Sequence, residues 1–537
     1  MSSTVQRMNF RPVSAPGAPG GASVRAWRAV ERVFDRVFQA ADNPWRHLGA
    51  LAFFFFWIVT ASGIYLYVFF DTSVAGAFRS VESMTNEQWY AGGVMRSLHR
   101  YASDAFVVVV VLHLLKELVA GRFAGFRWFS WVSGVPLAWL TLASGIGGYW
   151  LAWDRLAQFV AVATAEWFDA LPFFGEPLVR NFLTPAAVSD RFFTLLIFLH
   201  IGIPLALLAG MFIHIQRVNH ADVVPARALG WGTFAALLAL SLVRPAVSEG
   251  PADLATVPQA IAFDWFYLAF YPLVYAWSAE AVWVLAGTVT LGLLLLPFVA
   301  RGAPAPVARV DLANCNGCAR CFADCPYAAI EMHARSGKRP GQKMPVIIPG
   351  LCASCGICTG ACPSSTPFRS NEWLVTGIDM PQQPINAARE ALERMLPGLR
   401  GERRVIVIGC DHGADVRRLE EEGVGALSLL CIGMLPPAFI EYALRRGADG
   451  VLIAACREGE CAYRLGNDWL TQRLAGAREP HLRASVPRDR ITLISAGAGE
   501  EALLDRALSG FRGRLAAMPK NEPRRSSRDK PARGLVS

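Results

Sequence analysis

Cysteine is missing from the whole first part of the chain. No cysteine precedes Cys315, and all 12 cysteines lie between Cys315 and Cys461 of the 537 residues. The first part therefore forms no disulfide and offers no thiol for covalent attachment of a prosthetic group. The chain also opens without the short apolar core and small-residue cleavage site of a secretory signal peptide, so we expect none.

Signatures of nucleotide chemistry and covalent catalysis are equally absent. The sequence contains no Gly-rich phosphate loop, no nucleophile triad and no flavin site. The Gly-rich stretch 494–500 (ISAGAGE) lacks the strand–G-x-G-x-x-G–helix context of a dinucleotide site. The basic stretch 520–534 is typical of a solvated, disordered end, and we expect no nucleic-acid partner.

Long apolar runs are present instead, and they fill the first 300 residues. A run of about 20 apolar residues can cross a membrane as a helix. Lys and Arg gather in the loops on one side of these runs, which places both chain ends in the cytoplasm. We therefore expect a multi-pass protein of the cytoplasmic membrane, in contact with lipid, with its cysteines on the cytoplasmic side. The six predicted spans are 47–70, 98–119, 129–151, 191–215, 228–246 and 279–300.

Eight of the cysteines form the pattern C-x2-C-x2-C-x3-C-P twice. A reducing compartment favours metal ligation over disulfides, and this spacing predicts two 4Fe–4S clusters. Zinc is the alternative, but C-x2-C-x2-C is crowded for a tetrahedral zinc site. The fourth cysteine of each motif, expected to open a short helix, would reach the other cluster. The predicted ligand sets are Cys315, Cys318 and Cys321 with Cys362, and Cys352, Cys355 and Cys358 with Cys325. Residues 308–368 resemble bacterial two-cluster ferredoxins.

Three of the other four cysteines, Cys410, Cys431 and Cys456, end or follow apolar, strand-like runs. Cysteines placed after successive strands of an α/β unit converge at the carboxyl edge of a parallel sheet. Buried structural thiols are the alternative. The stretch LLCIGMLPPAFIEYALRRGADGVLIAACREGECAYRLGN, within 403–512, resembles the delta subunit of methyl-viologen-reducing hydrogenase. That resemblance implies one 2Fe–2S cluster and docking onto a flavin-containing, heterodisulfide-reductase-like protein. The expected ligands are Cys410, Cys431, Cys456 and Cys461, with His412 as a weaker substitute.

Two apolar runs each carry a pair of histidines with the same spacing. His99 and His113 are fourteen residues apart, as are His200 and His214. On a helix this interval is roughly 21 Å. One such histidine is usually a hydrogen-bonded core residue, but two matched pairs indicate two helices that hold two b haems. We expect His99 with His200 on one haem and His113 with His214 on the other.

Glycines repeat the interval of fourteen in the first and third predicted spans. Glycine has no Cβ, so a flat macrocycle can approach the backbone closely. Small residues also serve helix packing in membranes, which is the alternative. The glycines expected beside the haems are Gly49, Gly63, Gly134 and Gly148.

Residues 44–300 resemble cytochrome b of quinol-oxidising complexes, especially the form split into cytochrome b and subunit IV. The stretches that carry the resemblance are GVPLAWLTLASGIGGYWLAWD and GPADLATVPQAIAFDWFYLAFYPLV. The Pro-Glu-Trp-Tyr motif of that family reads Phe-Asp-Trp-Phe here, and Ala152 replaces a family proline. The resemblance implies that Asp264 accepts the proton of a quinol, although a structural role is an alternative. It also suggests that Arg100 contacts a haem propionate or anchors the helix at the interface, and that His220 lines a second quinone site.

These parts predict a composite fold: an all-α transmembrane bundle of about six spans, a ferredoxin-like α+β module and an α/β iron–sulfur domain. We expect electron transfer between the quinone pool and a soluble flavin or heterodisulfide-reductase-like partner, and an oligomer such as a dimer. The alternative is a non-enzymatic anchor that relays electrons without a quinone site of its own. The predicted regions are 1–40 (disordered, basic), 41–301 (membrane domain), 302–372 (ferredoxin), 373–402 (linker), 403–515 (2Fe–2S domain) and 516–537 (disordered tail).

Overall fold

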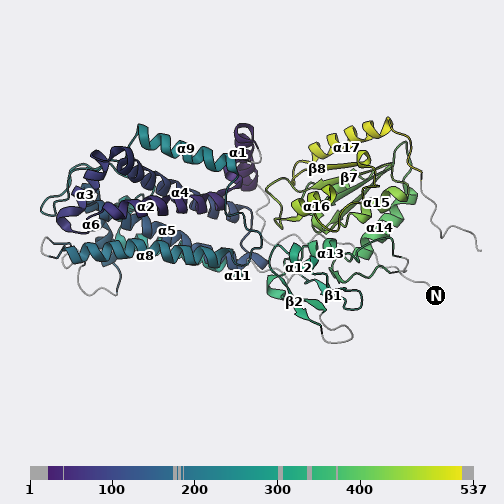
Figure 1. Cartoon of the computed structure of the whole chain (residues 1–537), viewed down its shortest axis with the longest axis horizontal. Helices are drawn as coiled ribbons and strands as arrows, with labels where there is room; N and C mark the ends of the chain where they lie inside the picture. Colours follow the sequence, from purple (N-terminus) through teal and green to yellow (C-terminus); the bar gives the residue numbers. More distant parts are fainter. Residues whose placement is uncertain are drawn as a thin grey trace, which may run out of the picture. The chain divides into compact units, whose positions relative to one another are not determined.

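The computed structural model describes residues 22–39, 42–172, 178, 183–184, 187–299, 306–335, 342–369 and 373–522. These residues form two compact units, each with its own buried apolar core (Figure 1). The helical unit contains the described parts of 14–216 and 221–302. The C-terminal unit contains those of 303–537 together with the short segment Arg217–His220.

Two pairs of long helices form the centre of the helical unit. Helix α2 packs along α4, and α5 packs along α8 (Figure 1). Helix α5 ends where Trp153 enters the left-handed region (φ 46°), and Asp154 then caps the next helix by accepting the Ala157 N–H at 2.8 Å. The helices are α1 (Ala22–Phe38), α2 (Leu48–Phe69), α3 (Val74–Asn86), α4 (Val94–Val119), α5 (Trp128–Ala152), α6 (Arg155–Asp169), α8 (Asp190–Ile215), α9 (Arg227–Val243), α10 (Tyr271–Ala276) and α11 (Ala279–Val299).

Four segments of the helical unit are long and apolar enough to cross a membrane, and they match four of the six predicted spans. The other two predicted spans, 98–119 and 228–246, form α4 and α9. Helix α4 carries several ionisable side chains and α9 has only 17 residues, so neither has both the length and the apolar composition of the four segments. The unit therefore has the composition of a multi-pass membrane domain. The four segments are Leu48–Phe69, Gly125–Ala152, Asp190–Ile215 and Ala279–Val299.

The predicted disordered segment 1–40 is wrong for its second half, which forms α1. The helix is held by Trp27, whose Nε1 donates to Glu31 at 3.0 Å and whose ring lies 4.9 Å from that of Trp45. The composition of this Arg-rich stretch does not reveal that its apolar side chains recur at helical spacing. Residues 1–21 lie outside the described part of the chain.

The first half of the C-terminal unit carries the paired cysteine motifs. Strand β1 (Arg309–Val310) pairs antiparallel with β4 (Ile378–Asp379), and β2 (Ile330–Ala334) pairs with β3 (Lys343–Ile347). Short helices α12 (Arg320–Asp324) and α13 (Ile357–Ala361) lie between these strands in sequence. Cys325 and Cys362 follow the last residues of these helices, so the prediction that they open helices is wrong. Pro326 and Pro363 come next, where a helix cannot continue.

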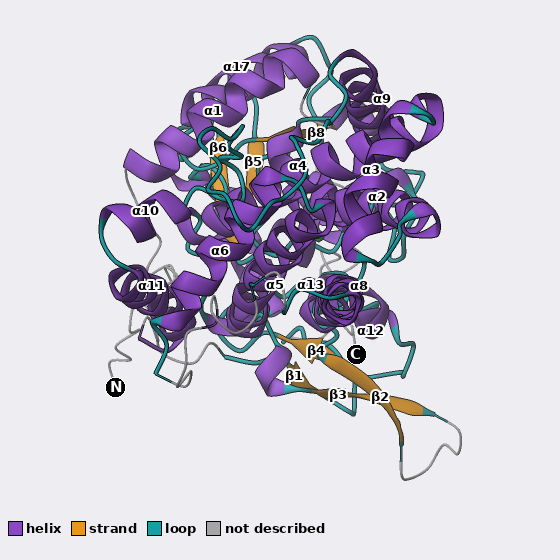
Figure 2. Ribbon diagram, turned by 90° about the vertical axis from the view of Figure 1, so that its left-hand side faces the viewer, coloured by secondary structure: helices purple, strands orange, loops and turns teal. Residues whose placement is uncertain are grey.

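The α/β half is built on a parallel four-stranded sheet of order β6-β5-β7-β8. Figure 2 draws the strands of the C-terminal unit in orange. Apolar cores cover both faces of this sheet. The predicted linker 373–402 is wrong, because it supplies β4 and helix α14, whose Leu392 and Leu396 are buried in one of these cores. The elements are α14 (Ile385–Gly398), β5 (Val405–Cys410), β6 (Val424–Leu429), α15 (Ala438–Arg445), β7 (Gly450–Ala455), α16 (Gly466–Ala475), β8 (Ile491–Ser495) and α17 (Glu501–Ala516).

The segment Arg217–His220 packs within the C-terminal unit. Asn219 donates from its backbone N–H to Pro326 O (2.9 Å) and from Nδ2 to Cys325 O (2.9 Å). Arg464 donates to the carbonyls of Asn219 and His220. The ring of His220, which the sequence suggested for a second quinone site, lies 5.4 Å from the ring of Trp469.

Candidate redox centres

The four helical histidines use Nδ1 for hydrogen bonds to neighbouring helices in three of four cases. His99 Nδ1 donates to Val59 O of α2 (3.0 Å) and lies 3.2 Å from Ser62 Oγ. His200 Nδ1 donates to Ser144 O of α5 at 3.1 Å, and His214 Nδ1 lies 3.1 Å from Ser133 Oγ. A bond at Nδ1 fixes the tautomer and leaves Nε2 available as a metal ligand.

Each histidine faces a glycine of the helix beside it. A Cβ added at Gly63 would lie 2.9 Å from His99 Cε1, and one at Gly148 would lie 3.0 Å from His200 Cε1. The same holds for Gly134 and His214 (3.2 Å) and for Gly49 and His113 (3.6 Å). A side chain larger than hydrogen would therefore displace at least three of the four rings. The structure thus brings together all eight residues that the interval of fourteen singled out.

The spacing between the histidines fits a metal held by two imidazoles. The ring centroids of His99 and His200 are 6.3 Å apart. His214 lies within electrostatic range of His113, its predicted partner. Half-buried imidazoles in an apolar bundle are the donors that b haems require, so these residues fit two haems.

Two serines that contact the histidine rings were not among the predicted site residues. Ser62 and Ser133 directly precede Gly63 and Gly134, and each contacts a histidine Nδ1. The carbonyls that accept from His99 and His200 belong to Val59 and Ser144, which lie four residues before Gly63 and Gly148. The repeated Ser-Gly dipeptide in the first and third predicted spans was the available signal.

Asp264 is buried and fully engaged by other groups. Its Oδ2 accepts from Arg100 Nη2 and from Tyr149 OH, and its Oδ1 accepts the Phe266 N–H at 2.6 Å. The Arg100 guanidinium also lies 3.4 Å from Asp104 and stacks over the Tyr149 ring at 4.5 Å. Arg100 therefore forms an ion pair with Asp264 in this structure, and its suggested contact with a haem propionate stays a prediction. Asp104 and Tyr149 were missed because only the fold brings them to Asp264.

The first predicted cysteine set lines one small cavity of about 20 Å³. Its members come from both motifs, because Cys362 joins Cys315, Cys318 and Cys321 there. Burial raises the pKa of the Cys321 thiol to about 12, so a cluster must displace a proton to bind it at neutral pH. Cys318 is exposed, which leaves this set open to solvent on one side.

The second predicted set is also assembled across the motifs. Cys325 and Cys352 interact with one another, and both interact with Cys355 and Cys358. Cys355 and Cys358 are 9% and 8% exposed. Burial raises the pKa of Cys358 well above its usual range, so this set is also protonated when free.

The last four cysteines meet at the carboxyl edge of the parallel sheet, as their positions after β5, β6 and β7 predict. Cys410 Sγ lies 3.3 Å from Cys456 Sγ, Cys431 contacts both Cys410 and Cys461, and Cys456 contacts Cys461. The contact with Cys410 raises the pKa of Cys431. His412 lies within electrostatic range of Cys410, and its Nε2 lies 3.2 Å from Tyr463 OH, so its role as a substitute ligand stays a prediction.

Among the described residues, no group of three or more His, Cys, Asp and Glu side chains has the arrangement that holds a single metal ion. A sulfide-bridged cluster separates its thiolates by the size of the cluster, so the crossed cysteine sets fit multinuclear centres better than single ions. The four buried thiols fit a small centre with four sulfur ligands.

Comparison with known proteins places three families along the chain. Cytochrome b/b6/petB matches residues 35–221, a 4Fe-4S dicluster domain matches 314–366, and the delta subunit of methyl-viologen-reducing hydrogenase matches 410–518. Among solved structures, a chain of a hyperthermophilic respiratory Complex III is similar at 22% identity and a TM-score of 0.41, over 51% of this chain and 82% of that chain. In chain order, the protein therefore matches family models for cytochrome b/b6, a 4Fe-4S dicluster domain and the hydrogenase delta subunit.

Proposed function

We propose that the protein transfers electrons between the quinone pool and a soluble cytoplasmic partner. Two b haems would be held by His99 with His200 and by His113 with His214. Two 4Fe–4S clusters and one 2Fe–2S cluster would be held by the three cysteine sets. Bound haems and clusters supply one-electron chemistry, while the chain sets their spacing, ligands and surroundings.

The observation that carries the proposal is the fourfold histidine–glycine match in the helical unit. Each of four histidines at an interval of fourteen faces a glycine at the same interval on the next helix. A bundle that needed polar residues for packing alone would not repeat both intervals. Two layers of histidines along the bundle axis support electron movement across the membrane, with all six predicted helices as spans.

The C-terminal unit supports the choice of a soluble partner. It is similar to the delta subunit of methyl-viologen-reducing hydrogenase over residues 410–518. That resemblance implies docking onto a flavin-containing, heterodisulfide-reductase-like protein. The positive-inside distribution supports a cytoplasmic position for this unit. Its four-thiol site would exchange electrons with that partner.

Rapid mixing tests the quinone link. The purified chain, loaded with haem and chemically reduced, is mixed with a short-chain quinone analogue while the haem absorbance is followed. Fast reoxidation is expected, and Asp264→Asn should slow it by roughly 10²-fold, since general acid–base groups contribute factors of this order. The matched control is Asp253→Asn, an exposed carboxylate before the same loop motif. An unchanged rate in Asp264→Asn with intact haems contradicts the assigned role.

One observation favours the second candidate, a relay without a quinone site. Arg100 and Tyr149 already occupy Asp264 Oδ2, and backbone N–H groups occupy Oδ1. A carboxylate so engaged acts as a structural anchor unless quinone binding displaces Arg100. If the reduced chain shows no response to any quinone analogue but still reduces a soluble acceptor, the relay is the correct function.

A further inference from the structure

The second ferredoxin motif packs against the four-thiol site with glycine at each point of contact. A Cβ on Gly433 would lie 2.8 Å from Gly466 Cα and 3.1 Å from Ile357 Cγ1 of α13. A Cβ on Gly356 would lie 2.7 Å from Met434 Sδ, and one on Gly360 would overlap the Gly433 carbonyl. At Gly360 the two backbones therefore approach closely, while at Gly356 and Gly433 the absence of a Cβ lets the Met434 and Ile357 side chains pack directly on the backbone.

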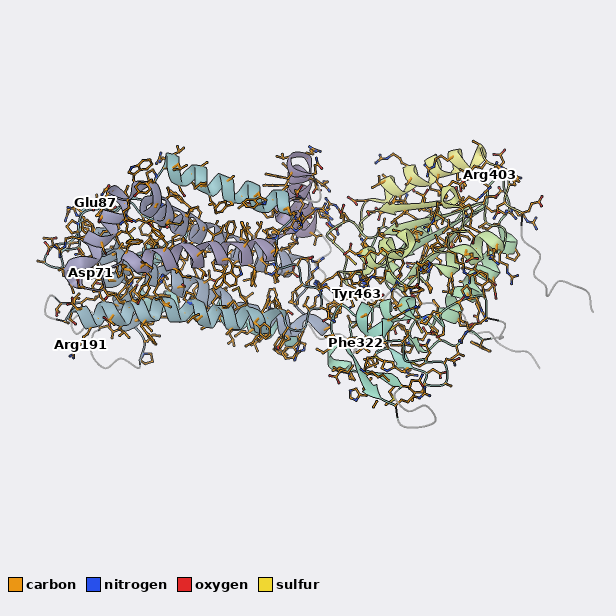
Figure 3. All side chains as sticks on the ribbon, viewed as in Figure 1. Asp71, Glu87, Arg191, Phe322, Arg403 and Tyr463 are labelled. Atoms are coloured by element: carbon orange, nitrogen blue, oxygen red, sulfur yellow. The ribbon has the colours of Figure 1, made fainter. Side chains whose placement is uncertain are left out.

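Cysteines of the two sites share one buried apolar cluster. Cys355 of the second set and Cys431 of the four-thiol site pack there with Ile357, Leu465 and Trp469. Cys431 is fully buried and Cys355 is 9% exposed, so both thiols lie in apolar surroundings. Tyr463, labelled in Figure 3, packs against this cluster and lies within electrostatic range of both cysteines.

A buried ion pair fixes the contact. Asp324, the last residue of α12, accepts from Arg473 Nη2 (2.5 Å) and Arg478 Nη1 (2.6 Å), both from the α/β half. Arg473 is fully buried and also donates to the Gly433 carbonyl at 2.8 Å. Trp469 Nε1 donates to Asp324 O at 3.0 Å. Such a pair is stable only in well-defined geometry, which makes the contact between the two halves rigid.

We propose that the cluster on the Cys325/Cys352/Cys355/Cys358 set and the cluster on the four-thiol set are one directly coupled redox pair. This inference rests on the cofactors assigned under the proposed function. The other 4Fe–4S cluster, on the set that contains Cys318, then lies one step further from the four-thiol site. Passage of one electron oxidises one cluster of the pair by one electron and reduces the other by one, with no bond or proton changed.

Tyr463 packs against the apolar cluster that contains Cys355 and Cys431, and its hydroxyl lies 3.2 Å from His412 Nε2. The order of centres that follows is the Cys318 cluster, the Cys355 cluster and then the four-thiol cluster. Electrons that leave through the four-thiol site therefore pass the Cys355 set first.

Electron paramagnetic resonance of the full-length chain tests the coupling. Magnetic relaxation of one cluster by another falls steeply with distance, so only the adjacent cluster should affect the 2Fe–2S signal. In the unmodified protein, the microwave power that half-saturates this signal should rise several-fold when the 4Fe–4S clusters are poised reduced instead of oxidised. Half-saturation that does not depend on the redox state of the 4Fe–4S clusters would overturn the proposal.

Two variants assign the effect to one cluster. Cys355→Ala should abolish the several-fold change, whereas Cys318→Ala should preserve it. If Cys318→Ala abolishes the change and Cys355→Ala preserves it, the Cys318 cluster is the neighbour of the four-thiol site and the proposed order is wrong. A third variant, Cys431→Ala, should remove the 2Fe–2S signal itself. If the 2Fe–2S signal survives in Cys431→Ala, the cofactor assignment of the proposed function is wrong, and so is this inference. If the signal is lost in this variant but half-saturation in the unmodified protein does not respond to the 4Fe–4S clusters, only the inference is wrong.

Discussion

Lys116 Nζ donates to the carbonyl of Trp45 at 2.7 Å, four residues before Gly49. The equivalent carbonyls before Gly63 and Gly148 accept from the Nδ1 atoms of His99 and His200. Beside His113, therefore, a lysine occupies the place that a histidine takes elsewhere in the bundle. The two proposed haems consequently have different surroundings, although their ligands are the same.

Replacing Lys116 with methionine should lower the midpoint potential of the haem held by His113 and His214. The oxidised haem carries one more positive charge than the reduced haem, so loss of a nearby cation favours oxidation. A carbonyl released to His113 Nδ1 would act in the same direction, because it makes the ligand more basic. Optical redox titration should show one haem shifted and the other unchanged. Lys116→Arg, which keeps the charge, is the control, and an equal shift of both haems would contradict the assignment.

Gly63→Val should remove one haem and leave the other. A Cβ at Gly63 would lie 2.9 Å from His99 Cε1, so the ring could not keep its place against α2. About half of the bound haem should be lost, which a haem-to-protein ratio measures directly. Gly202→Val is the matched control, because a Cβ at Gly202 meets nothing within 4 Å. Loss of both haems, or of neither, would count against separate sites.

Local patterns predicted the pairs and sets that lie on regular elements. The interval of fourteen placed His99 and His200 correctly because helix geometry is fixed, so spacing in sequence becomes spacing in space. Cys410, Cys431 and Cys456 were placed at one sheet edge because parallel strands end on the same side. In both cases the regular geometry of the helix or sheet converts a position in the sequence into a position in space.

Contacts between distant segments were not predictable in the same way. Asp264 meets Arg100 across 164 residues, and nothing in either local sequence specifies the other. The stretch 373–402 read as a linker because β4 has two residues and its partner β1 lies far upstream. The pairing of β1 with β4 depends on the whole module, which no single window displays.

Arg100→Met should destabilise the helical unit by roughly 3 kcal/mol, the low end for breaking a buried ion pair. The low end applies because the Arg100 side chain is 31% exposed, while that of Asp264 is 1% exposed. Thermal unfolding in detergent should show the loss as a lower midpoint. The double variant Arg100→Met/Asp264→Asn should recover part of it, since the Asp264 charge is then no longer buried without its partner. If the double variant is as unstable as the sum of the single variants, the ion pair is not the source of the effect.

The two 4Fe–4S clusters should be lost in a fixed order when iron is removed. The set that contains Cys318 is open to solvent, whereas Cys355 and Cys358 are buried. A chelator should therefore strip the Cys318 cluster first, visible as loss of one of two resonance signals. Burial raises the pKa of Cys321 to about 12, so protons compete with iron for this thiolate. The Cys318 cluster should therefore be lost faster at pH 6 than at pH 8. Cys318→Ala should show only the slow phase. A single phase in the unmodified chain, or faster loss at the higher pH, would contradict both the exposure and the protonation arguments.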